Sequence, residues 1–262
     1  MTLLRGAAWQ AEVVESGDRL AVPLATARRI AFCALEPGVG TSRLTVLTAR
    51  TLAGARRGRV LVAGLAENGA ELLLPTPAAP ALGFGGPDSG RLETGVPDAV
   101  AEATTAHGSL RGIRAGIGAA AWDERVAPIA RFFDVVIADW GVQPIDGGTH
   151  GSGLLDAAAT AHVVCLVSAA ERASSEAAIA AATALRTALP GTDVVVALVD
   201  RTRSGSPWPA IAARTAPVPV VPIPHDAMLA RTGRAATGTR RAALGLAGLL
   251  MAGADPSARS AS

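Results

Sequence analysis

Short apolar runs alternate with helix-like segments along most of the chain, and this alternation restricts the fold more than any other feature of the sequence. Each run is unbroken and rich in aliphatic residues, as expected of strands buried on both faces. The apolar runs are residues 30–35, 59–64, 134–139, 162–167, 194–199 and 218–223. The helix-like segments are residues 43–56, 122–132, 153–161, 171–188, 208–215 and 240–252. This order predicts an α/β fold with a mostly parallel sheet and helices on both faces.

We expect one domain, because 262 residues suit a single α/β domain and no segment resembles a linker between two. The expected boundaries are an N-terminal extension at 1–29, the α/β domain at 30–253 and a disordered tail at 254–262. Within the extension, residues 9–24 form two short extended runs around a Ser-Gly-Asp turn, which predicts a β-hairpin. The Pro- and Gly-rich residues 75–97 predict a surface loop or a flap.

The composition indicates a cytoplasmic protein with a core of small aliphatic side chains. Half of the residues are apolar but only 3% are aromatic, so Ala, Val and Leu must fill most of the core. Residues 1–10 lack the apolar core of a signal peptide, and the apolar stretch 242–253 is about half as long as a membrane-spanning helix. Cys33 and Cys165 lie in apolar runs, which favours buried free thiols over a disulfide or a metal site. A net charge of +2 with scattered arginine pairs gives no strong nucleic-acid signal.

Residues 36–43, EPGVGTSR, have the sequence context of a phosphate-binding loop. They follow the apolar run 30–35 and lead into the helix-like segment 43–56. Backbone N–H groups of such a turn and the positive end of the helix would point at one anion. A loop of this kind also needs a lysine for the phosphates, but all 24 basic residues of the chain are arginines. The residues expected to line the phosphate site are Gly38, Val39, Gly40, Thr41, Ser42 and Arg43.

From about Arg28 to Ala252, the order and spacing of these features resemble the MinD/ParA family of deviant P-loop ATPases. The family's loop, KGGVGKTT, corresponds to EPGVGTSR in this chain. Residues 134–141, DVVIADWG, resemble the strand that ends in the aspartate of switch II, here Asp139. Weaker matches are residues 57–62, 154–167 and 217–226. The resemblance implies a P-loop NTPase-like fold of the MinD/ParA type, with ATP and Mg²⁺ as the family's ligands.

Each departure from the family pattern removes a group that ATP hydrolysis uses. Thr41 stands where the family has the lysine that neutralises the β- and γ-phosphates. Glu36 stands where the family has a lysine that reaches the partner's nucleotide across the ATP-bound dimer. The family's second strand ends in a D-x-D pair that handles Mg²⁺ and the attacking water, and those positions fall on Gly64 and Ala66. The resemblance therefore implies that hydrolysis is lost.

Other parts of the family pattern are retained. Gly38 and Gly40 permit a tight turn and a close approach of the backbone to a ligand. Ser42 keeps a hydroxyl where the family holds Mg²⁺, and Asp139 keeps a carboxylate near a strand's carboxyl end, so these two are the expected Mg²⁺ ligands. Two structural roles compete with this one, namely Ser42 as a helix N-cap and Asp139 as a turn former at the strand's end. We expect the side chain of Arg43 to project away from the loop.

Three functions stay open at this point. The first is a MinD/ParA-like pseudo-ATPase without a cofactor, a regulatory or scaffolding protein for an unknown protein partner. It would form no ATP-dependent dimer, although a nucleotide-independent homodimer is open to it. The second is a weak ATP- and Mg²⁺-binding conformational switch of the partitioning, septum-site or type VII secretion-associated kind, in an actinobacterial host that fits the composition. The third is a serine hydrolase using Ser42, His150 and Asp139, although their chain order differs from that of subtilisin-like proteases.

Overall fold

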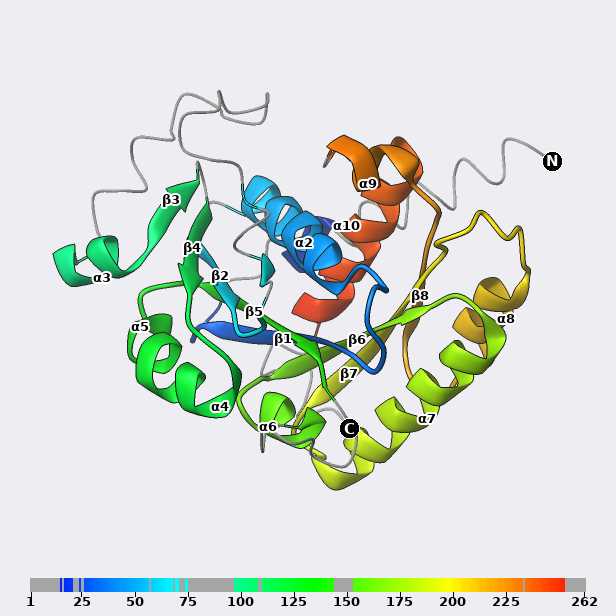
Figure 1. The fold of residues 1–262 in the computed structure, drawn as a ribbon, viewed down its shortest axis with the longest axis horizontal. Coiled ribbons are helices and arrows are strands. Elements are labelled where there is room, and N and C mark those ends of the chain that lie inside the picture. Colours follow the sequence, from blue (N-terminus) through cyan, green and yellow to red (C-terminus); the bar gives the residue numbers. More distant parts are fainter. Residues whose placement is uncertain are drawn as a thin grey trace.

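The computed structural model describes residues 15, 17–20, 24, 26–56, 58–67, 69–70, 74, 97–107, 110–143, 153–232 and 234–252. These residues form an eight-stranded sheet in the order β3-β4-β2-β5-β1-β6-β7-β8 (Figure 1). Neighbouring strands are parallel except β3 and β4, which pair antiparallel at one edge. The strands are β1 Arg28–Ala34, β2 Val60–Gly64, β3 Thr105–His107, β4 Leu110–Arg114, β5 Val135–Val142, β6 Val163–Ala169, β7 Asp193–Val199 and β8 Val220–Ile223. The prediction of an α/β fold with a mostly parallel sheet is confirmed.

Helices cover both faces of this sheet. On one face, α2 (Thr41–Ala55) and α10 (Thr237–Met251) pack side by side, with the short α9 (Ala227–Thr232) beside α10 (Figure 1). The opposite face carries α4 Gly118–Ala121, a π-helical turn at Trp122–Val126, α5 Ala127–Ala130, α6 Leu154–Ala159, α7 Arg172–Ala188 and α8 Trp208–Thr215. The remaining helix, α3 (Asp98–Ala103), precedes the edge strand β3. The layers place the carboxyl ends of the parallel strands, where ligands bind in such folds, along one rim of the sheet.

Strand β1 shows why the central strands read as unbroken apolar runs. Successive side chains of a strand point to opposite faces of its sheet. Ala31 and Cys33 pack in the core below α6, α7 and α8, whereas Ile30 and Phe32 pack in the core below α2 and α10. Because both faces are covered by helices, β1 has no position for a polar side chain along its centre.

Some elements were not anticipated from the sequence. The expected apolar runs match β1, β2 and β5 to β8, and the expected helices match α2, α6 to α8 and α10. The elements α3, β3, β4 and α9 were missed. Strand β4 has no continuous apolar run because Arg111 and Gly112 interrupt it. The expected helix 122–132 is instead a π-helical turn followed by the short α5, with α4 before it.

The predicted N-terminal hairpin is wrong where the structure tests it. Glu15 and residues 17–20 are helical, so the turn expected around Gly17 does not form. A salt bridge between Glu15 and Arg19, at helical i,i+4 spacing, favours this helix, and Leu20 anchors it in the core. The segment 75–97, except Pro97, and the tail 254–262 lie outside the described residues. Of the helices that the structure describes, none is long and apolar enough to cross a membrane.

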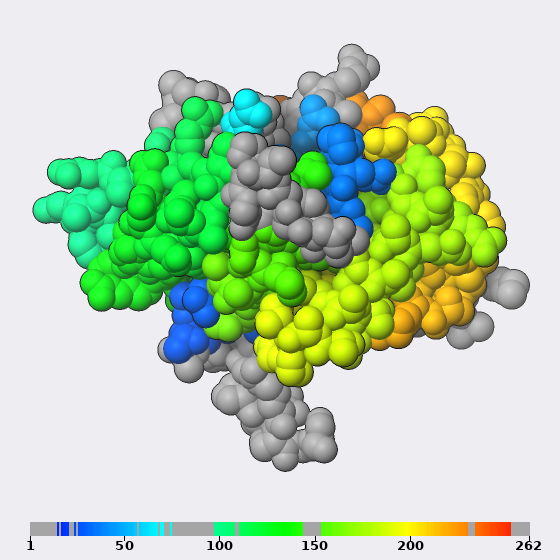
Figure 2. All heavy atoms as spheres, turned by 60° about the horizontal axis from the view of Figure 1, so that its bottom comes forward, coloured from blue at the N-terminus to red at the C-terminus, as the bar shows by residue number. Residues whose placement is uncertain are grey.

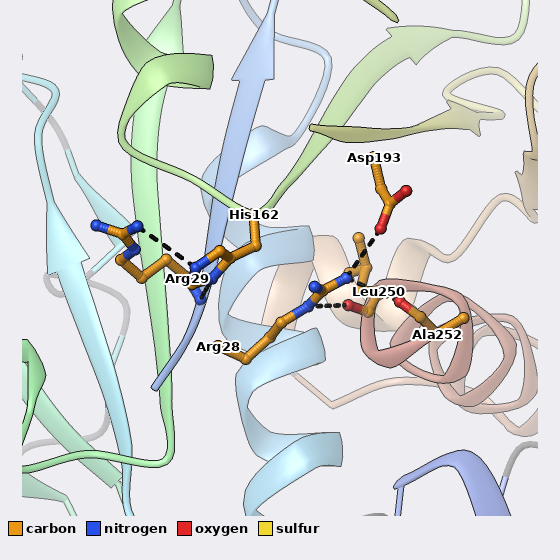
Figure 3. Close-up of polar contacts among 6 residues, drawn as sticks. All are labelled: Arg28, Arg29, His162, Asp193, Leu250 and Ala252. Carbon is orange, nitrogen blue, oxygen red and sulfur yellow. Dashed lines mark hydrogen bonds and ion pairs between the residues drawn. The ribbon is translucent and has the colours of Figure 1, made fainter. Parts of the chain in front are cut away.

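A buried arginine ties the first strand to the last helix (Figure 3). Arg28 is 5% exposed, and its Nε and Nη2 atoms donate hydrogen bonds to the carbonyls of Leu250 and Ala252 at 3.1 and 2.8 Å. Its Nη2 also lies 3.3 Å from Oδ2 of the exposed Asp193. The last carbonyls of a helix have no partners within the helix. Arg28 therefore acts as the C-terminal cap of α10, at the amino end of β1.

Candidate functional site

The loop after β1 has the two-glycine turn that the sequence predicts. Gly38 and Gly40 have φ angles of 75° and 91°, in the left-handed region that other residues avoid. Val39, between them, is buried in the core. Gly40 is the N-cap of α2, and its carbonyl accepts a hydrogen bond from the N–H of Leu44 at 2.9 Å. The turn thus places the N-terminus of α2, whose first N–H groups have no partner within the helix, at the rim of the sheet.

Thr41, the position of the missing lysine, is the first residue of α2 and is 8% exposed. A lysine here would carry an ammonium group on a four-carbon stem, whereas threonine ends in a methyl group and a hydroxyl directly on Cβ. Ser42 is half-buried at the second helical position, and Arg43 is exposed at the third. The interpretation of Ser42 as the N-cap is wrong, because Gly40 holds that position.

Glu36 brings a carboxylate to the loop where the resemblance expects a lysine. The side chain is half-buried, and its Oε1 atom is buried with no hydrogen-bond partner in the described part of the chain. Two negative charges 4 Å apart repel by about 4 kcal/mol at the effective dielectric constant near a protein surface. Glu36 therefore disfavours a phosphate at this rim.

Arg201, which no motif marked in advance, also reaches the loop. It lies between β7 and α8, and its Nη1 atom is 3.4 Å from the carbonyl oxygen of Gly38. That is a long hydrogen bond, and the guanidinium is exposed, so the contact is weak. In this position the arginine approaches a carbonyl of the loop.

Asp139 lies directly beneath this rim, within β5. It is fully buried and pairs with Phe32 of β1 on one side and Gly64 of β2 on the other. Its Oδ1 atom accepts a hydrogen bond from the N–H of Gly141 at 3.1 Å, in a stretch where the register with β1 shifts. The interpretation of Asp139 as a turn former at the end of the strand is wrong about its position, because β5 continues to Val142. The hydrogen bond itself is of the kind that turn-forming aspartates make.

The two positions of the lost D-x-D pair lie close to Asp139 in space. Gly64 ends β2 and pairs with Asp139, and a Cβ atom built on Gly141 would lie 2.7 Å from the Cβ of Ala66. The next carboxylate, Glu67, is exposed. In the alignment that the resemblance implies, glycine and alanine stand at the two acidic positions. Among the described residues, no group of three or more His, Cys, Asp or Glu side chains could hold a metal ion.

The two cysteines are buried free thiols, as predicted. Burial raises the pKa of the Cys33 thiol, and the nearby Asp139 and Cys165 raise it further. Burial also raises the pKa of Cys165. Both thiols therefore stay protonated at neutral pH and are poor nucleophiles and metal ligands.

The serine hydrolase alternative depends on His150, which lies outside the described residues. The other two members of that triad are Ser42, half-buried in α2, and Asp139, fully buried in β5. His162 lies at the amino end of β6, where its Nδ1 atom accepts a hydrogen bond from the N–H of Arg29 at 3.0 Å (Figure 3). It lies at the end of the sheet opposite the loop.

The loop lies at the surface. Figure 2 shows the blue atoms that follow β1 beside yellow-green atoms of α7, with green atoms of the chain near the end of β5 close by. Val142, the last residue of β5, is 45% exposed. The rim of the sheet near the loop therefore carries exposed apolar surface as well as the Glu36 carboxylate.

Comparison with known proteins identifies the fold. No family model matches the chain, and no curated protein does. Among solved structures, the chain is similar to a ParA family ATPase from Chlorobium tepidum, with 15% identity over 85% of this chain and 98% of that one and a TM-score of 0.57. It is also similar to MinD of Aquifex aeolicus in the MinC:MinD complex, at 18% identity over 82% and 86% of the two chains and a TM-score of 0.53. A third is an aspartate-to-alanine variant of Cyanothece McdA in complex with ATP, at 15% identity over 85% and 96% and a TM-score of 0.54. The expected MinD/ParA-like P-loop NTPase fold is confirmed.

Proposed function

We propose that this chain, with its MinD/ParA-like fold, is a pseudo-ATPase that acts as a regulatory or scaffolding protein. The observation that carries the proposal is Thr41, buried at the first position of α2 where a phosphate loop needs its cation, in a chain without lysine. Phosphoryl transfer depends almost entirely on positioning and on charge stabilisation, with little covalent chemistry for the protein. Without the cation at this position, the loop lacks one of the charges that stabilise the transferred phosphoryl group.

The neighbouring residues support the same proposal. The Glu36 carboxylate adds repulsion at the rim, and Gly64 and Ala66 leave Asp139 without the acidic pair of the family. These changes are compatible with an intact fold, because the sheet, the two-glycine turn and α2 are all formed. A fold that keeps its shape but loses its charges can still present surfaces to partners. One similar structure, MinD of Aquifex aeolicus, is of a protein in complex with another, MinC.

A weak ATP- and Mg²⁺-binding switch is the second candidate, favoured by the left-handed Gly38 and Gly40 and by the retained Asp139. One similar protein, the McdA variant of Cyanothece, was solved with ATP. Ser42 and Asp139 would hold the Mg²⁺, which fits a cation that commonly binds one or two carboxylates together with phosphates and water. The bound ion would neutralise phosphate charge that no lysine neutralises here.

The test is a thermal-shift titration with ATP, ADP and GTP, with and without Mg²⁺, together with an ATPase assay. We expect no turnover and no saturable shift up to millimolar nucleotide. The double variant Glu36→Lys/Thr41→Lys restores both lysines, and we expect it to gain an ATP-dependent shift. Arg43→Lys controls for the presence of a lysine as such, because it adds one at the exposed third position of α2, beyond the two-glycine turn, without changing the charge. A saturable Mg²⁺-dependent shift in the unmodified chain would replace the pseudo-ATPase by the switch, and turnover would exclude both.

A further inference from the structure

The loop that joins β7 to α8 (Figure 1) is an exposed segment that carries three hydroxyl side chains, Thr202, Ser204 and Ser206. Residues 201–207 are all exposed, and none of them belongs to a helix or a strand. Ser204 lies at the centre of this segment, with three exposed residues before it and three after it. An enzyme that modifies a serine must enclose both the serine and its neighbours, and the loop offers Ser204 with that surrounding.

Two arginines precede Ser204, at the third position and the first position before it, Arg201 and Arg203. The guanidinium of Arg203 is exposed and makes no hydrogen bond or ion pair within the described part of the chain. In that same part, Arg201 has no ion pair, and its contact with the carbonyl of Gly38 is long at 3.4 Å. Both cations can therefore pair with carboxylates of an enzyme, and protein kinases select their substrates by such charge patterns.

Weak contacts hold the loop in its folded shape. Oδ1 of Asp200 accepts hydrogen bonds from the N–H groups of Thr202 and Ser204 at 3.1 and 3.2 Å, at the surface where water competes for them. Against these bonds, Arg203 has a φ of 54°, a left-handed conformation that strains an arginine. An extended conformation, in which a peptide enters a kinase cleft, relieves this strain and exchanges the two hydrogen bonds for bonds to water. Opening the loop around Ser204 therefore costs little.

The other two hydroxyls of the loop fit such an enzyme less well. Oγ of Ser206 accepts a hydrogen bond from the N–H of Trp208 at 3.2 Å, so moving Ser206 into a cleft would disturb the start of α8. Thr202 lacks an arginine three positions before it. Oγ of Ser204 accepts a long hydrogen bond from the N–H of Ser206 at 3.3 Å, which leaves the hydroxyl proton of Ser204 available for transfer.

We propose that Ser204 is phosphorylated by a serine/threonine kinase that reads an arginine three positions before the serine, with ATP as the phosphate donor. Oγ of Ser204 attacks the γ-phosphorus of ATP, the bond between that phosphorus and the β–γ bridging oxygen breaks, and ADP leaves. The hydroxyl proton passes to the catalytic aspartate of the kinase. Arg201 and Arg203 bind acidic side chains of the kinase and fix the register of the loop in its cleft.

The phosphate reverses the charge of the loop. Residues 200–207 contain two arginines and one aspartate, a formal charge of +1. A phosphoserine adds about −1.5 to −2 charges at pH 7. Because the N–H of Ser204 binds the carboxylate of Asp200, repulsion between the phosphate and this carboxylate weakens that hydrogen bond. The proposal goes beyond the pseudo-ATPase function and does not depend on it, since phosphate incorporation at Ser204 and nucleotide titration of the loop 36–43 are separate measurements.

The test incubates the full, folded chain with the catalytic subunit of an arginine-directed kinase, ATP and Mg²⁺, below the melting temperature of the chain. Intact mass and peptide mass spectrometry should show one phosphate per chain, at Ser204, and Ser204→Ala should abolish it. Arg201→Gln removes the arginine three positions before the serine and should slow incorporation at least tenfold. Arg214→Gln is the matched control, because it removes the same charge from an exposed position of α8 and should leave the rate within twofold.

Hydrogen exchange gives a second readout on the loop itself. The amides of Thr202 and Ser204 should exchange faster in the phosphorylated chain, because the phosphate repels the Asp200 carboxylate that binds them. No incorporation into the unmodified chain, or a phosphate that maps to Ser206 instead of Ser204, would overturn the proposal. So would equal rates in Arg201→Gln and Arg214→Gln, or equal incorporation by a kinase that reads acidic residues, because the arginines would then play no part in recognition.

Discussion

At the level of single residues, the loop after β1 depends on backbone freedom more than on side chains. Gly40 has a φ of 91°, and a Cβ atom built on it would meet nothing within 4 Å. The cost of a side chain there is therefore backbone strain alone, without a clash. A substitution at Gly40 therefore tests the backbone conformation of the turn and not side-chain packing.

Gly40→Ala should lower the free energy of unfolding by about 1–2 kcal/mol, the cost of a left-handed conformation for an L residue. Gly54→Ala, in the last turn of the same helix, should instead raise it by up to about 1 kcal/mol, because alanine favours helix and the site has room. Urea denaturation of both variants gives the comparison. Equal effects of the same sign would show that the turn does not need the left-handed glycine.

Asp226 gives a pH-dependent contribution to stability. Burial raises the pKa of its carboxyl, but hydrogen bonds from the N–H groups of Leu229 and Ala236, from Thr239 and from the N–H of Met228 lower it by more. Because the folded-state pKa lies below the unfolded value, the stabilisation is complete above the unfolded pKa, about 3.9 for aspartate. It is lost as the pH falls further, through the folded pKa.

Asp226→Asn should therefore be less stable than the unmodified chain at pH 7, and the difference should shrink below about pH 4. Urea midpoints measured at pH 7 and pH 3 test this, with the exposed Glu102→Gln as the control for charge removal. A stability difference that stays constant between the two pH values would show that the carboxylate's charge does not matter there.

At the level of elements, α10 depends on a cap that comes from the other end of the chain. Replacing Arg28 by Gln removes the charged donors to the carbonyls of Leu250 and Ala252 and should cost about 3–6 kcal/mol, because hydrogen bonds from charged donors are worth about 1.5–3 kcal/mol each. Hydrogen exchange in the last turn of α10 should rise with it. Asp193→Asn is the control, since Asp193 is 61% exposed and its ion pair is worth under about 1 kcal/mol. An equal cost for both changes would assign the effect to the ion pair.

The elements that could be predicted from the sequence are those whose burial is continuous. β1 and β6 are covered on both faces and read as apolar runs, and α7 shows an apolar stripe at helical spacing. The sequence does not predict β4, because its pairing with β2 and β3, and not its own residues, makes it a strand. Gly112 is tolerated within it because the side chains of Leu74 and His107 approach the space that a side chain would need. The sequence predicts a hairpin in place of the N-terminal helix because the Ser-Gly-Asp turn signal competes with the i,i+4 pair of Glu15 and Arg19, whose contact only the structure shows.

Some features of the candidate site could be predicted from the sequence and others could not. The left-handed glycines and the place of Asp139 under the loop follow from the order of strand, turn and helix, and the sequence was enough to expect them. Arg201 reaches the loop from 163 residues away along the chain, a contact that depends on how β7 ends and that no local pattern encodes.

At the level of the whole molecule, the fold predicts how assembly responds to nucleotide. In the resembled family, ATP joins two subunits because a lysine of each reaches the partner's phosphates, and here that position carries the half-buried Glu36. With Thr41 also neutral, the negatively charged phosphates of ATP would meet the Glu36 carboxylate at this rim and no lysine, since the chain has none. We therefore expect any dimer of this chain to form through surface that does not involve ATP.

The molar mass measured by light scattering after size exclusion should accordingly be the same with and without millimolar ATP and Mg²⁺, at every protein concentration. In Glu36→Lys/Thr41→Lys, ATP should shift the mass toward a dimer, because both missing cations are then present. Arg43→Lys again controls for the addition of a lysine as such and should show no shift. An ATP-dependent dimer of the unmodified chain would contradict this expectation and would mean that another cation replaces the lysines. Arg201, whose Nη1 atom lies 3.4 Å from the carbonyl oxygen of Gly38, is one candidate, and Arg201→Gln tests it.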